Sequence, residues 1–354
     1  MAGGGTGGHV IPALAVAEEL RRRGHQAMFI GVKTGIEARL VPQAGYPIEW
    51  IEIQGIQRRG IARTAEALWQ LPAAVLRSRR LLREHHAAAV FSMGGYAAGP
   101  VVLAAALARV PIVAMEPNAM PGLVTRKMAR WYHKALVSFP ETIRYFPPRV
   151  AEISGLPVRK AFFEIPPCPP GEKLVVLVTG GSRGARALNR AARESWPFFR
   201  EAASPVVWIV QAGRDEEPSM QRAFAETGLA GKVTAFIEDM PAAFAAVDII
   251  VGRAGAGNVS ELAAAGKPSV LVPFPYAADD HQTRNAEAMQ RAGAARMIPE
   301  NDFNGRRLFD LIEELRRTPG KLTAMGQAAR AMAHPGAAKR AADALEEAAQ
   351  NALT

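Results

Sequence analysis

Near its start the chain carries a histidine, which can do acid–base chemistry. It directly follows a glycine-rich loop, whose backbone can approach a ligand closely. Five of the first eight residues are glycine, and His9 follows them directly. A glycine turn that opens a helix exposes backbone N–H groups to a phosphate or a sugar. Histidine titrates near neutral pH, which suits a general base. A tight turn and a structural histidine are the plain alternative; five glycines favour a binding loop with His9 as candidate base.

The same loop contains the spacing G-x-G-x-x-G between Gly3 and Gly8. A dinucleotide site also needs an acidic residue after the second strand, where it binds the ribose. Here the apolar run 29–32 is followed by Lys33. We therefore do not predict an NAD site at this loop.

Three further polar residues follow short apolar runs in the first half. Tyr96 lies in a second glycine-rich segment, and Glu116 and Asn118 follow the next apolar run. Ligands of open α/β sheets bind beyond the carboxyl ends of the strands, so we expect these residues to converge on the first glycine loop. Asn118 also has a plain explanation as a turn residue, because prolines flank it.

The second half of the chain repeats the glycine turn. Gly180–Ala185 follows an apolar run and is predicted to place Ser182 and backbone amides on a diphosphate. The segment 252–268 is a stronger signal, because small residues precede a helix start and Glu261 can accept hydrogen bonds from both ribose hydroxyls. The alternative is that Ser260 and Glu261 merely favour the start of the helix.

Polar side chains also gather in the segment 275–289, after another apolar run. They can hold sugar hydroxyls, whereas the dense His and Cys spacing of a zinc site does not occur there. We predict a sugar-binding segment, with metal ligation as the less favoured alternative. The side chains are Asp279, Asp280, His281, Gln282 and Asn285.

Apolar runs alternate with amphipathic segments along the chain, a pattern that predicts parallel strands joined by helices. Residues 11–24 are predicted to form a helix that ends at Gly24. Each half contains a strand, a glycine turn and a helix, so we predict an α/β fold with two Rossmann-like domains across a cleft. The predicted strands lie within residues 26–32, 87–93, 110–116, 134–139, 173–181, 206–213, 232–239, 247–255 and 267–275.

The proline-rich segment 155–173 is the predicted connector between the domains. Only Met1 and Ala2 precede the first glycine loop, where a strand is normally found. Either residues upstream of Met1 supply that strand, which we favour, or the first domain lacks its central strand and is less stable. The segment 337–353 is predicted to be a helix that packs back on the first domain.

Positive charge is concentrated in the first half. Residues 1–160 hold 21 Lys and Arg against 10 acidic residues, a net charge of +11, whereas residues 161–354 hold 22 against 23. This asymmetry predicts an anionic partner for the first half, which is phosphate-bearing lipid, a membrane surface or nucleic acid. A solvated basic surface is the alternative.

Two segments are candidates for membrane contact. Residues 87–108 carry no charge, but paired glycines and a proline interrupt them, so we predict a buried strand, a turn and a helix start instead of a membrane span. Residues 53–83 mix isoleucines, Leu68, Trp69 and Leu71 with seven arginines, as in a helix on a membrane surface. A helix with one buried face and outward arginines is an almost equally good explanation.

The remaining composition fits a two-domain protein of a reducing compartment. The chain has 354 residues, too many for one ordinary core, and 49% of them are hydrophobic. The single Cys168 excludes a disulfide framework. The polar, glycine-rich start does not predict a signal peptide.

Taken together, these motifs resemble the MurG family of UDP-N-acetylglucosamine transferases, glycosyltransferase family 28. Each motif alone is a weak signal, but eight in order over nearly the whole chain are specific. The resemblance implies a GT-B fold and an inverting transfer of GlcNAc to the MurNAc 4-hydroxyl of undecaprenyl-diphospho-MurNAc-pentapeptide (lipid I), which makes lipid II for peptidoglycan. The motifs read GGGTGGHVIPALAVA, GGYAAGP, EPNAMPG, GLPVR, GGSRGAR, FIEDM, GAGNVSELAAAGKP and DHQTRNA.

The resemblance also implies the site residues. His9, Tyr96 and Glu116 would form the acceptor side, with His9 and Glu116 catalytic. On the donor side, the first glycine loop, Asn118 and Gln282 would contact the sugar, and the other residues would contact uracil, ribose or diphosphate. The implied donor residues are Thr6, Gly7, Gly8, Asn118, Arg159, Ser182, Ile237, Ala256, Gly257, Asn258, Val259, Ser260, Glu261 and Gln282.

The same resemblance assigns roles to the parts of the chain. Residues 1–158 would face the acceptor and an anionic membrane, 159–336 would bind UDP-GlcNAc, and 337–354 would form the returning helix. The expected partners are UDP-GlcNAc, the undecaprenyl-linked acceptor and the membrane surface, without nucleic acid. The expected location is peripheral, on the cytoplasmic face of the cell inner membrane, and neither cofactor nor metal is expected.

One position departs from the family pattern. Met115 stands where many members carry a histidine, and a thioether cannot do acid–base work, so the base is expected to be His9 or Glu116, preferably His9. Another GT-B enzyme, such as a diacylglycerol glycosyltransferase or a UDP-GlcNAc 2-epimerase, would share the donor features. A non-catalytic UDP-sugar-binding membrane protein is a further alternative.

Overall fold

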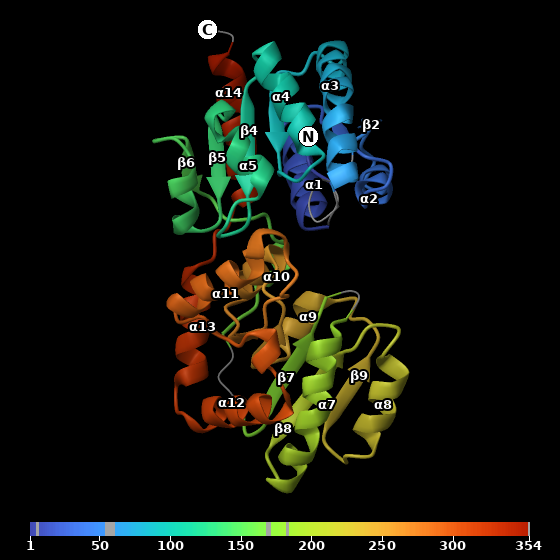
Figure 1. Cartoon of the computed structure of the whole chain (residues 1–354). Coiled ribbons are helices and arrows are strands. Elements are labelled where there is room, and N and C mark those ends of the chain that lie inside the picture. The colour runs from blue at the N-terminus through green and yellow to red at the C-terminus, as the bar shows by residue number, and fades with distance from the viewer. Residues whose placement is uncertain (5–6, 54–60, 168–170, 182–183, 353–354) are drawn as a thin grey trace. The chain divides into compact units, whose positions relative to one another are not determined.

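The computed structural model describes residues 1–4, 7–53, 61–167, 171–181 and 184–352, with the backbone alone at 61–68. The chain divides into two compact units (Figure 1). Unit 1 comprises Met1–Pro157 and His334–Thr354, and unit 2 comprises Val158–Ala333. Each unit is an α/β layer structure with its own apolar core and parallel strands, as the alternating pattern predicts.

Unit 1 is built on a parallel sheet in which β3, β4, β5 and β6 are neighbours in that order, with β1 paired to β2 beside it. Its inner strands are buried on both faces, which explains their nearly continuous apolar sequence. The strands are β1 (Phe29–Gly31), β2 (Ile48–Trp50), β3 (Val90–Ser92), β4 (Ile112–Glu116), β5 (Lys134–Val137) and β6 (Ala151–Ile153).

The helices of unit 1 pack against this sheet, and α3 lies along α4 (Figure 1). Helix α1 ends as predicted, because Gly24 is left-handed and His25 N donates to the Leu20 carbonyl oxygen. The helical segments are α1 (Gly7–Arg22), α2 (Glu37–Gln43), α3 (Ile61–Glu84), α4 (Ala98–Ala108), α5 (Leu123–Met128), η1 (Ala129–Trp131), η2 (Pro140–Tyr145) and α14 (Ala337–Asn351).

Ala2 occupies the place between β1 and β3. It forms parallel bridges to Ile30 on one side and to Ser92 on the other. Ala2 N donates to the Phe91 carbonyl oxygen at 2.7 Å, and Met93 N donates to the Ala2 carbonyl oxygen at 2.8 Å. The residues directly before the first glycine loop therefore join the two strand groups at the centre of the sheet of unit 1.

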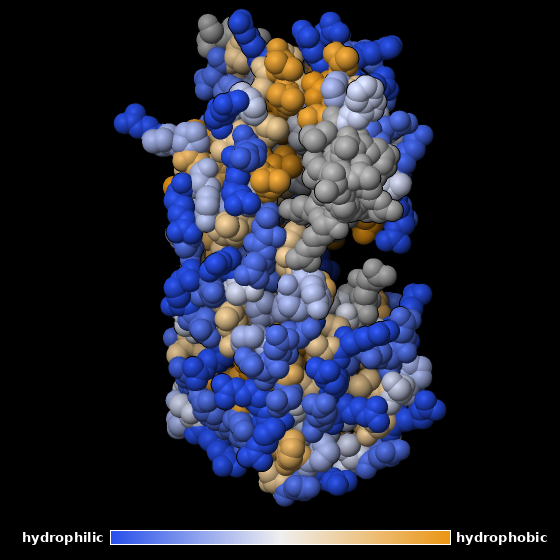
Figure 2. All heavy atoms as spheres, viewed as in Figure 1, coloured by the Kyte–Doolittle hydropathy of each residue, from blue (hydrophilic) through white to orange (hydrophobic). Residues whose placement is uncertain are grey.

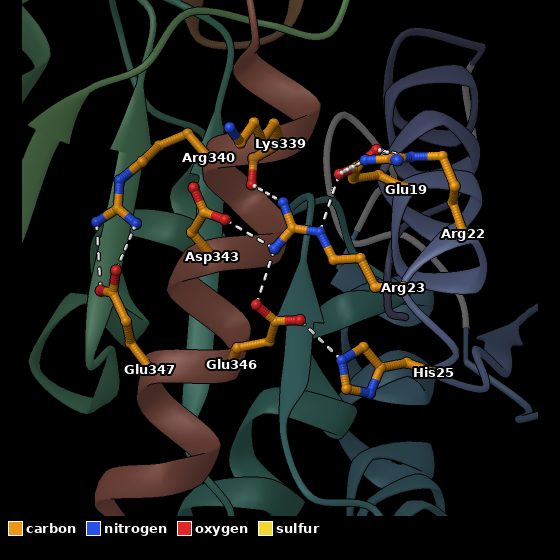
Figure 3. A network of polar contacts seen from close by, with 9 residues as sticks. All are labelled: Glu19, Arg22, Arg23, His25, Lys339, Arg340, Asp343, Glu346 and Glu347. Carbon is orange, nitrogen blue, oxygen red and sulfur yellow. Dashed lines mark hydrogen bonds and ion pairs between the residues drawn. The ribbon is translucent and has the colours of Figure 1, made fainter.

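Helix α14 packs on α1 and on β4 and β5, although more than 300 residues separate it from α1 in sequence. Figure 3 shows the polar network between these helices. Arg23 donates to the carboxylates of Asp343 at 2.7 Å and Glu346 at 2.8 Å, and His25 Nε2 lies 2.8 Å from the other Glu346 oxygen. Hydrogen-bonded charge pairs therefore anchor the last helix on unit 1.

Unit 2 contains a parallel sheet with the order β12-β11-β10-β7-β8-β9. The chain order reverses beside β7, which is the topological switch point of a Rossmann-like sheet. The strands are β7 (Leu174–Thr179), β8 (Val206–Gln211), β9 (Gly231–Thr234), β10 (Ile249–Gly252), β11 (Ser269–Leu271) and β12 (Ala295–Met297).

Large aromatic residues pack between the sheet and helices of unit 2. Trp196 and Phe199 from α7 are fully buried, and Phe199 packs edge-on against Trp208 of β8 with ring centroids 5.1 Å apart. The helical segments are α6 (Lys160–Phe163), α7 (Arg186–Glu201), α8 (Glu217–Ala225), α9 (Met240–Ala245), α10 (Ala256–Ala265), η3 (Ala278–Asp280), α11 (His281–Arg291), η4 (Glu300–Asp302), α12 (Gly305–Arg317) and α13 (Lys321–Ala331).

The nine predicted strands all occur within or across their predicted segments, and residues 87–108 form β3, a turn and α4, as predicted. The largest differences in boundary are at β9, which ends at Thr234 and not near residue 239, and at β11, which ends at Leu271 and not near residue 275. Strands β2, β6 and β12 were not predicted. In the part of the chain that the structure describes, no helix is both long and apolar enough to cross a bilayer.

Candidate functional site

Two glycine turns of unit 1 pack against each other. A Cβ atom on Gly95 would lie 3.3 Å from the Gly4 carbonyl oxygen and 3.3 Å from His9 Nδ1, and a Cβ on Gly3 would lie 2.7 Å from the Met93 Cβ. Gly95 is also left-handed, with φ +79°. The close approach therefore explains why glycine stands at these positions, and it brings His9 to the second turn.

His9 lies in the first turn of α1 and is half-buried. Its Nδ1 lies 3.2 Å from the Gly4 carbonyl oxygen. A carbonyl only accepts, so this hydrogen bond requires the proton on Nδ1 and leaves the lone pair of a neutral ring on Nε2. Thr6 lies outside the described residues, Gly7 opens the helix, and Gly8 is exposed.

The Glu116 carboxyl is buried at the end of β4, with 3% of the residue exposed. It accepts hydrogen bonds from Asn118 N and Asn118 Nδ2, both at 3.1 Å, and from Gly122 N at 3.2 Å. Burial raises its pKa to about 7, although these hydrogen bonds lower it. In this structure Glu116 therefore organises the loop from Asn118 to Gly122.

The second glycine turn is linked to Glu116 through Thr125. A Cβ on Gly94 would lie 2.8 Å from the Thr125 hydroxyl, which also hydrogen-bonds the Glu116 carboxyl. Tyr96 follows this turn and is half-buried, while the Asn118 carbonyl accepts from the Thr142 hydroxyl at 3.0 Å. The structure thus brings the predicted acceptor-side residues of unit 1 to one edge of its sheet.

A buried carboxyl that the sequence analysis missed backs the first glycine loop. Glu37, in the first turn of α2, is 1% exposed, and its Oε1 accepts from Val32 N at 3.2 Å. Cβ atoms on Gly4 and Gly35 would each lie 2.1 Å from one of its carboxyl oxygens. The carboxyl therefore fills the space that side chains at these two glycines would need.

The glycine turn of unit 2 follows β7, at the switch point of the sheet. Gly184 N donates to the Gly181 carbonyl oxygen at 2.9 Å, which closes the turn, and both glycines are left-handed. Ser182, which we predicted to approach the diphosphate, lies outside the described residues. Helix α7 begins directly after the turn (Figure 1).

Helix α10 begins after β10, with Gly255 at its N-cap. Within its first turns Asn258 donates to the Arg253 carbonyl oxygen at 2.7 Å, and Val259 is buried. Ala256, Gly257 and Ser260 are half-buried. Asn258 and Val259 therefore shape the strand–helix junction, and the backbone amides of the first turn are the groups suited to a phosphate.

Glu261 lies one turn further along α10, with 30% of its side chain exposed. Burial raises its pKa to about 7, against the opposing effect of Arg159. Arg159 Nη2 lies 3.9 Å from a Glu261 oxygen. The structure thus brings together two predicted donor residues that are far apart in sequence.

The other predicted donor residues follow β9 and β11, which are not neighbours in the sheet of unit 2. Ile237 is half-buried after β9, and Gln282 lies in the first turn of α11, where its Oε1 accepts from Phe274 N at 3.0 Å. This bond orients the Gln282 amide and leaves its NH₂ group as the donor. Asn285 instead donates to the Ala254 carbonyl oxygen in the core, so we no longer regard it as a sugar ligand.

Arg253 is a further residue to which the sequence analysis gave no role. It pairs with Glu300 at 2.5 Å and donates to the Val272 and Pro273 carbonyl oxygens, which fixes the ends of β10 and β11. Among the described residues, no group of three His, Cys, Asp or Glu side chains is arranged to hold a metal.

Two models of one protein family match this chain. Residues 1–137 match the glycosyltransferase family 28 N-terminal domain, and residues 175–345 match its C-terminal domain. A protein of Solibacter usitatus named UDP-N-acetylglucosamine–N-acetylmuramyl-(pentapeptide) pyrophosphoryl-undecaprenol N-acetylglucosamine transferase is 56% identical over 99% of this chain and 96% of its own. The protein of that name from Syntrophus aciditrophicus is 39% identical over 92% and 91%.

Among solved structures, MurG of Acinetobacter baumannii matches with a TM-score of 0.83 and 33% identity over 97% of both chains. A UDP complex of MnaA from S. aureus matches at 9% identity and a TM-score of 0.62, a likeness of fold alone. Both family domains and the high identity along nearly the whole length agree on one assignment. The chain belongs to glycosyltransferase family 28.

Proposed function

We propose that the chain transfers N-acetylglucosamine from UDP-GlcNAc to the 4-hydroxyl of N-acetylmuramyl-(pentapeptide) pyrophosphoryl-undecaprenol, with inversion at the anomeric carbon. The observation that carries this proposal is the 56% identity, over 99% of the chain, to a protein named for that transfer. The arrangement of polar groups in each unit fits the chemistry.

Unit 2 is proposed to hold the nucleotide. The amides at the start of α10 and the turn 180–184 would face the diphosphate, as helix N-termini and glycine turns commonly do. Glu261 would accept from the ribose hydroxyls, Ile237 would contact uracil through its backbone, and the Gln282 amide would donate to the sugar hydroxyls. Arg159 would add positive charge beside Glu261.

Unit 1 is proposed to supply the base. His9 Nε2 takes the proton of the MurNAc 4-hydroxyl as that oxygen attacks the anomeric carbon of GlcNAc. The bond from this carbon to the UDP oxygen breaks, and UDP leaves with the bonding electron pair. The transition state has oxocarbenium character, as in other glycosyl transfers. Positive groups and amides around the departing diphosphate stabilise the charge that develops there.

Glu116 is proposed to act through its surroundings instead of by direct proton transfer. Its carboxyl already accepts from the backbone and side chain of Asn118, which the family resemblance places at the donor sugar. Because Met115 carries no titratable group, His9 is the preferred base. Tyr96 would contact the acceptor beside it.

The direct test is incubation with UDP-GlcNAc and a short-chain lipid I analogue, followed by mass analysis. We expect the acceptor to gain one N-acetylhexosamine, joined through a β linkage, and an equal amount of UDP. Release of an epimerised or free sugar without change in the acceptor would reject the proposal.

Membrane binding is proposed for one face of α3. Leu71, Val75 and Ser78 face inward, whereas Trp69 is 86% exposed and Leu76 is 66% exposed on the outer face. Figure 2 shows apolar atoms gathered over α4, beside α3. An exposed tryptophan and leucine, continued by basic side chains, suit an anionic lipid surface. The exposed basic residues of this part of α3 are Arg77, Arg79, Arg80 and Arg83, of which Arg77 pairs with Glu49 and Arg80 with Glu84.

Vesicle sedimentation tests this surface. We expect binding to vesicles with anionic lipid to exceed binding to neutral vesicles, and Trp69→Ser with Leu76→Ser to reduce it at least several-fold. Ile153→Ser, which changes another exposed apolar residue of unit 1, is the matched control. Equal sedimentation of both variants would reject α3 as the contact. We propose the cytoplasmic face, where the nucleotide donor would be available.

A further inference from the structure

A closed ring of hydrogen bonds holds the glycine turn of unit 2 on its inner side. Gly181 N donates to the Thr179 hydroxyl oxygen at 3.2 Å, and that hydroxyl donates to Gln211 Oε1 at 3.0 Å. Gln211 Nε2 donates back to the Gly181 carbonyl oxygen at 3.2 Å. In this ring every group donates or accepts in the sense that its chemistry allows.

The positions of these residues follow from the strand register. Thr179 and Gln211 are the last residues of β7 and β8 and lie opposite each other in the parallel pair. Both are buried, with 5% and 1% exposed. A buried amide and hydroxyl are costly unless they are satisfied, and here the same hydrogen bonds that satisfy them fix the Gly181 peptide groups.

The exit of the turn is held by the residue that follows Gln211. A Cβ on Gly184 would lie 2.1 Å from the Ala212 carbonyl oxygen, so the backbone segments are in close contact. Asn189 Nδ2 donates to the same carbonyl at 2.8 Å. Consecutive residues at the end of β8 therefore hold both Gly181 and Gly184.

The ring has an electrostatic consequence for an anion. Gly181 is left-handed at φ +84°, and a Cβ there would meet no described atom within 4 Å, so sterics alone do not fix its peptide groups. The Gly181 carbonyl is instead bound by Gln211 Nε2 and Gly184 N. A carbonyl held inward keeps its partial negative charge away from the ligand side of the turn.

We infer that Thr179 and Gln211 are positioning residues for the donor diphosphate: they fix the Gly181 peptide groups at the start of the glycine turn, with the Gly181 carbonyl turned inward. This inference rests on the proposed function, which places the diphosphate at that turn. The ring is uncharged, so it fixes the turn without adding a negative charge that would repel the ligand.

The test measures UDP affinity of the full chain by calorimetry. We expect Gln211→Leu to weaken UDP binding about tenfold, and Thr179→Val by a smaller factor, because a buried network loses a donor or acceptor. The loss of UDP affinity in the double variant should be smaller than the product of the two single losses, because both changes break the same ring. Thr179→Ser keeps the hydroxyl and should bind as the wild type does.

The matched control is Ser204→Ala. Ser204 lies before the first residue of β8 and donates to the buried Glu313 carboxyl at the opposite end of that strand from Gln211. We expect this variant to lose thermal stability as the ring variants do, but to keep its UDP affinity. UDP affinities of the ring variants within twofold of this control would overturn the inference.

Gln211→Glu gives a readout that a purely structural role would not produce. A carboxylate cannot donate to the Gly181 carbonyl and repels it, whereas the protonated acid can donate. We expect the affinity of this variant for UDP, relative to the wild type at each pH, to fall as pH rises. A constant ratio would also overturn the inference.

UDP binding by the wild-type chain distinguishes failure of the proposed function from failure of this inference. If the wild-type chain does not bind UDP, the proposed function fails, and this inference fails with it. If the wild type binds UDP and the ring variants bind it equally well, the inference alone is rejected.

Discussion

The two units contain the same backbone device, a glycine turn between a strand end and a helix, yet they support it in opposite ways. In unit 1 the Glu37 carboxyl fills the space beside Gly4, so sterics hold the loop and an acidic group lies behind it. In unit 2 the uncharged Thr179–Gln211 ring holds a turn whose Gly181 has open space around it.

The two loops need glycine for different reasons, and the groups behind them favour different ligands. Glycine is required at Gly4 because a side chain would collide, and at Gly181 because φ is positive. An acidic group behind a loop disfavours an anion there, whereas an uncharged ring does not. This contrast is consistent with the proposal above, which has neutral sugar hydroxyls and the His9 base at unit 1 and the donor diphosphate at unit 2.

The largest expected effect is on turnover and comes from the proposed base in unit 1. His9→Ala should lower kcat by about 10²–10⁴-fold, because a general base is lost, while the affinity for UDP stays within twofold. The measurement is steady-state transfer to the lipid I analogue together with calorimetry. His25→Ala, which removes a histidine from the α14 network, is the control and should leave kcat unchanged. Wild-type turnover of His9→Ala would remove His9 as the base.

A pair of glycine substitutions tests the two kinds of support directly. Gly4→Ala should destabilise unit 1 by about 1–3 kcal/mol, since the new Cβ overlaps the Glu37 carboxyl. Gly181→Ala should cost only about 1 kcal/mol, from its left-handed conformation. Thermal unfolding of both variants measures the difference. Equal losses in the free energy of unfolding would show that the Glu37 side chain moves aside easily and does not hold the Gly4 loop.

The buried Glu116 predicts a pH dependence of stability. Its folded-state pKa of about 7 lies above the ordinary value of 4.5, so the folded state binds the proton more tightly. Its contribution is fully present below pH 4.5 and is lost as pH rises through 7. The melting temperature of Glu116→Gln should therefore change less with pH than that of the wild type between pH 5 and 8. Parallel curves would contradict this assignment.

The smallest expected effect concerns Glu261, whose pKa is also about 7. Only the ionised carboxylate accepts freely from both ribose hydroxyls, so UDP-GlcNAc should bind a few-fold more tightly as pH rises through 7. Calorimetry without acceptor measures this, and the diphosphate diester has no titration of its own in that range. Glu261→Gln should bind with a nearly constant affinity; the same pH dependence in both proteins would assign it to another group.

Helix α3 illustrates how a sequence pattern leaves alternatives of which packing decides only one part. The mixture of apolar residues and arginines in 53–83 predicted either a membrane-surface helix or a helix with one buried face. In the described part of α3 the buried face is confirmed, because Val75 and Ser78 face the core, whereas Trp69 and Leu76 are exposed and membrane contact stays a prediction. Helical periodicity places residues on faces, but which face meets the sheet depends on the neighbouring strand and on α4.

The sequence by itself determined the α/β class, the strand segments other than β2, β6 and β12, the positions of the glycine-rich motifs and the family, because these depend on local periodicity and on motifs that are short in sequence. Only the tertiary structure decided what supports each turn. Glu37 reaches Gly4 across 33 positions, and Gln211 reaches Gly181 across 30. Neither contact leaves a local pattern, because strand pairing and helix packing bring such residues together, and the cost of burying a polar group then requires that each one find a partner.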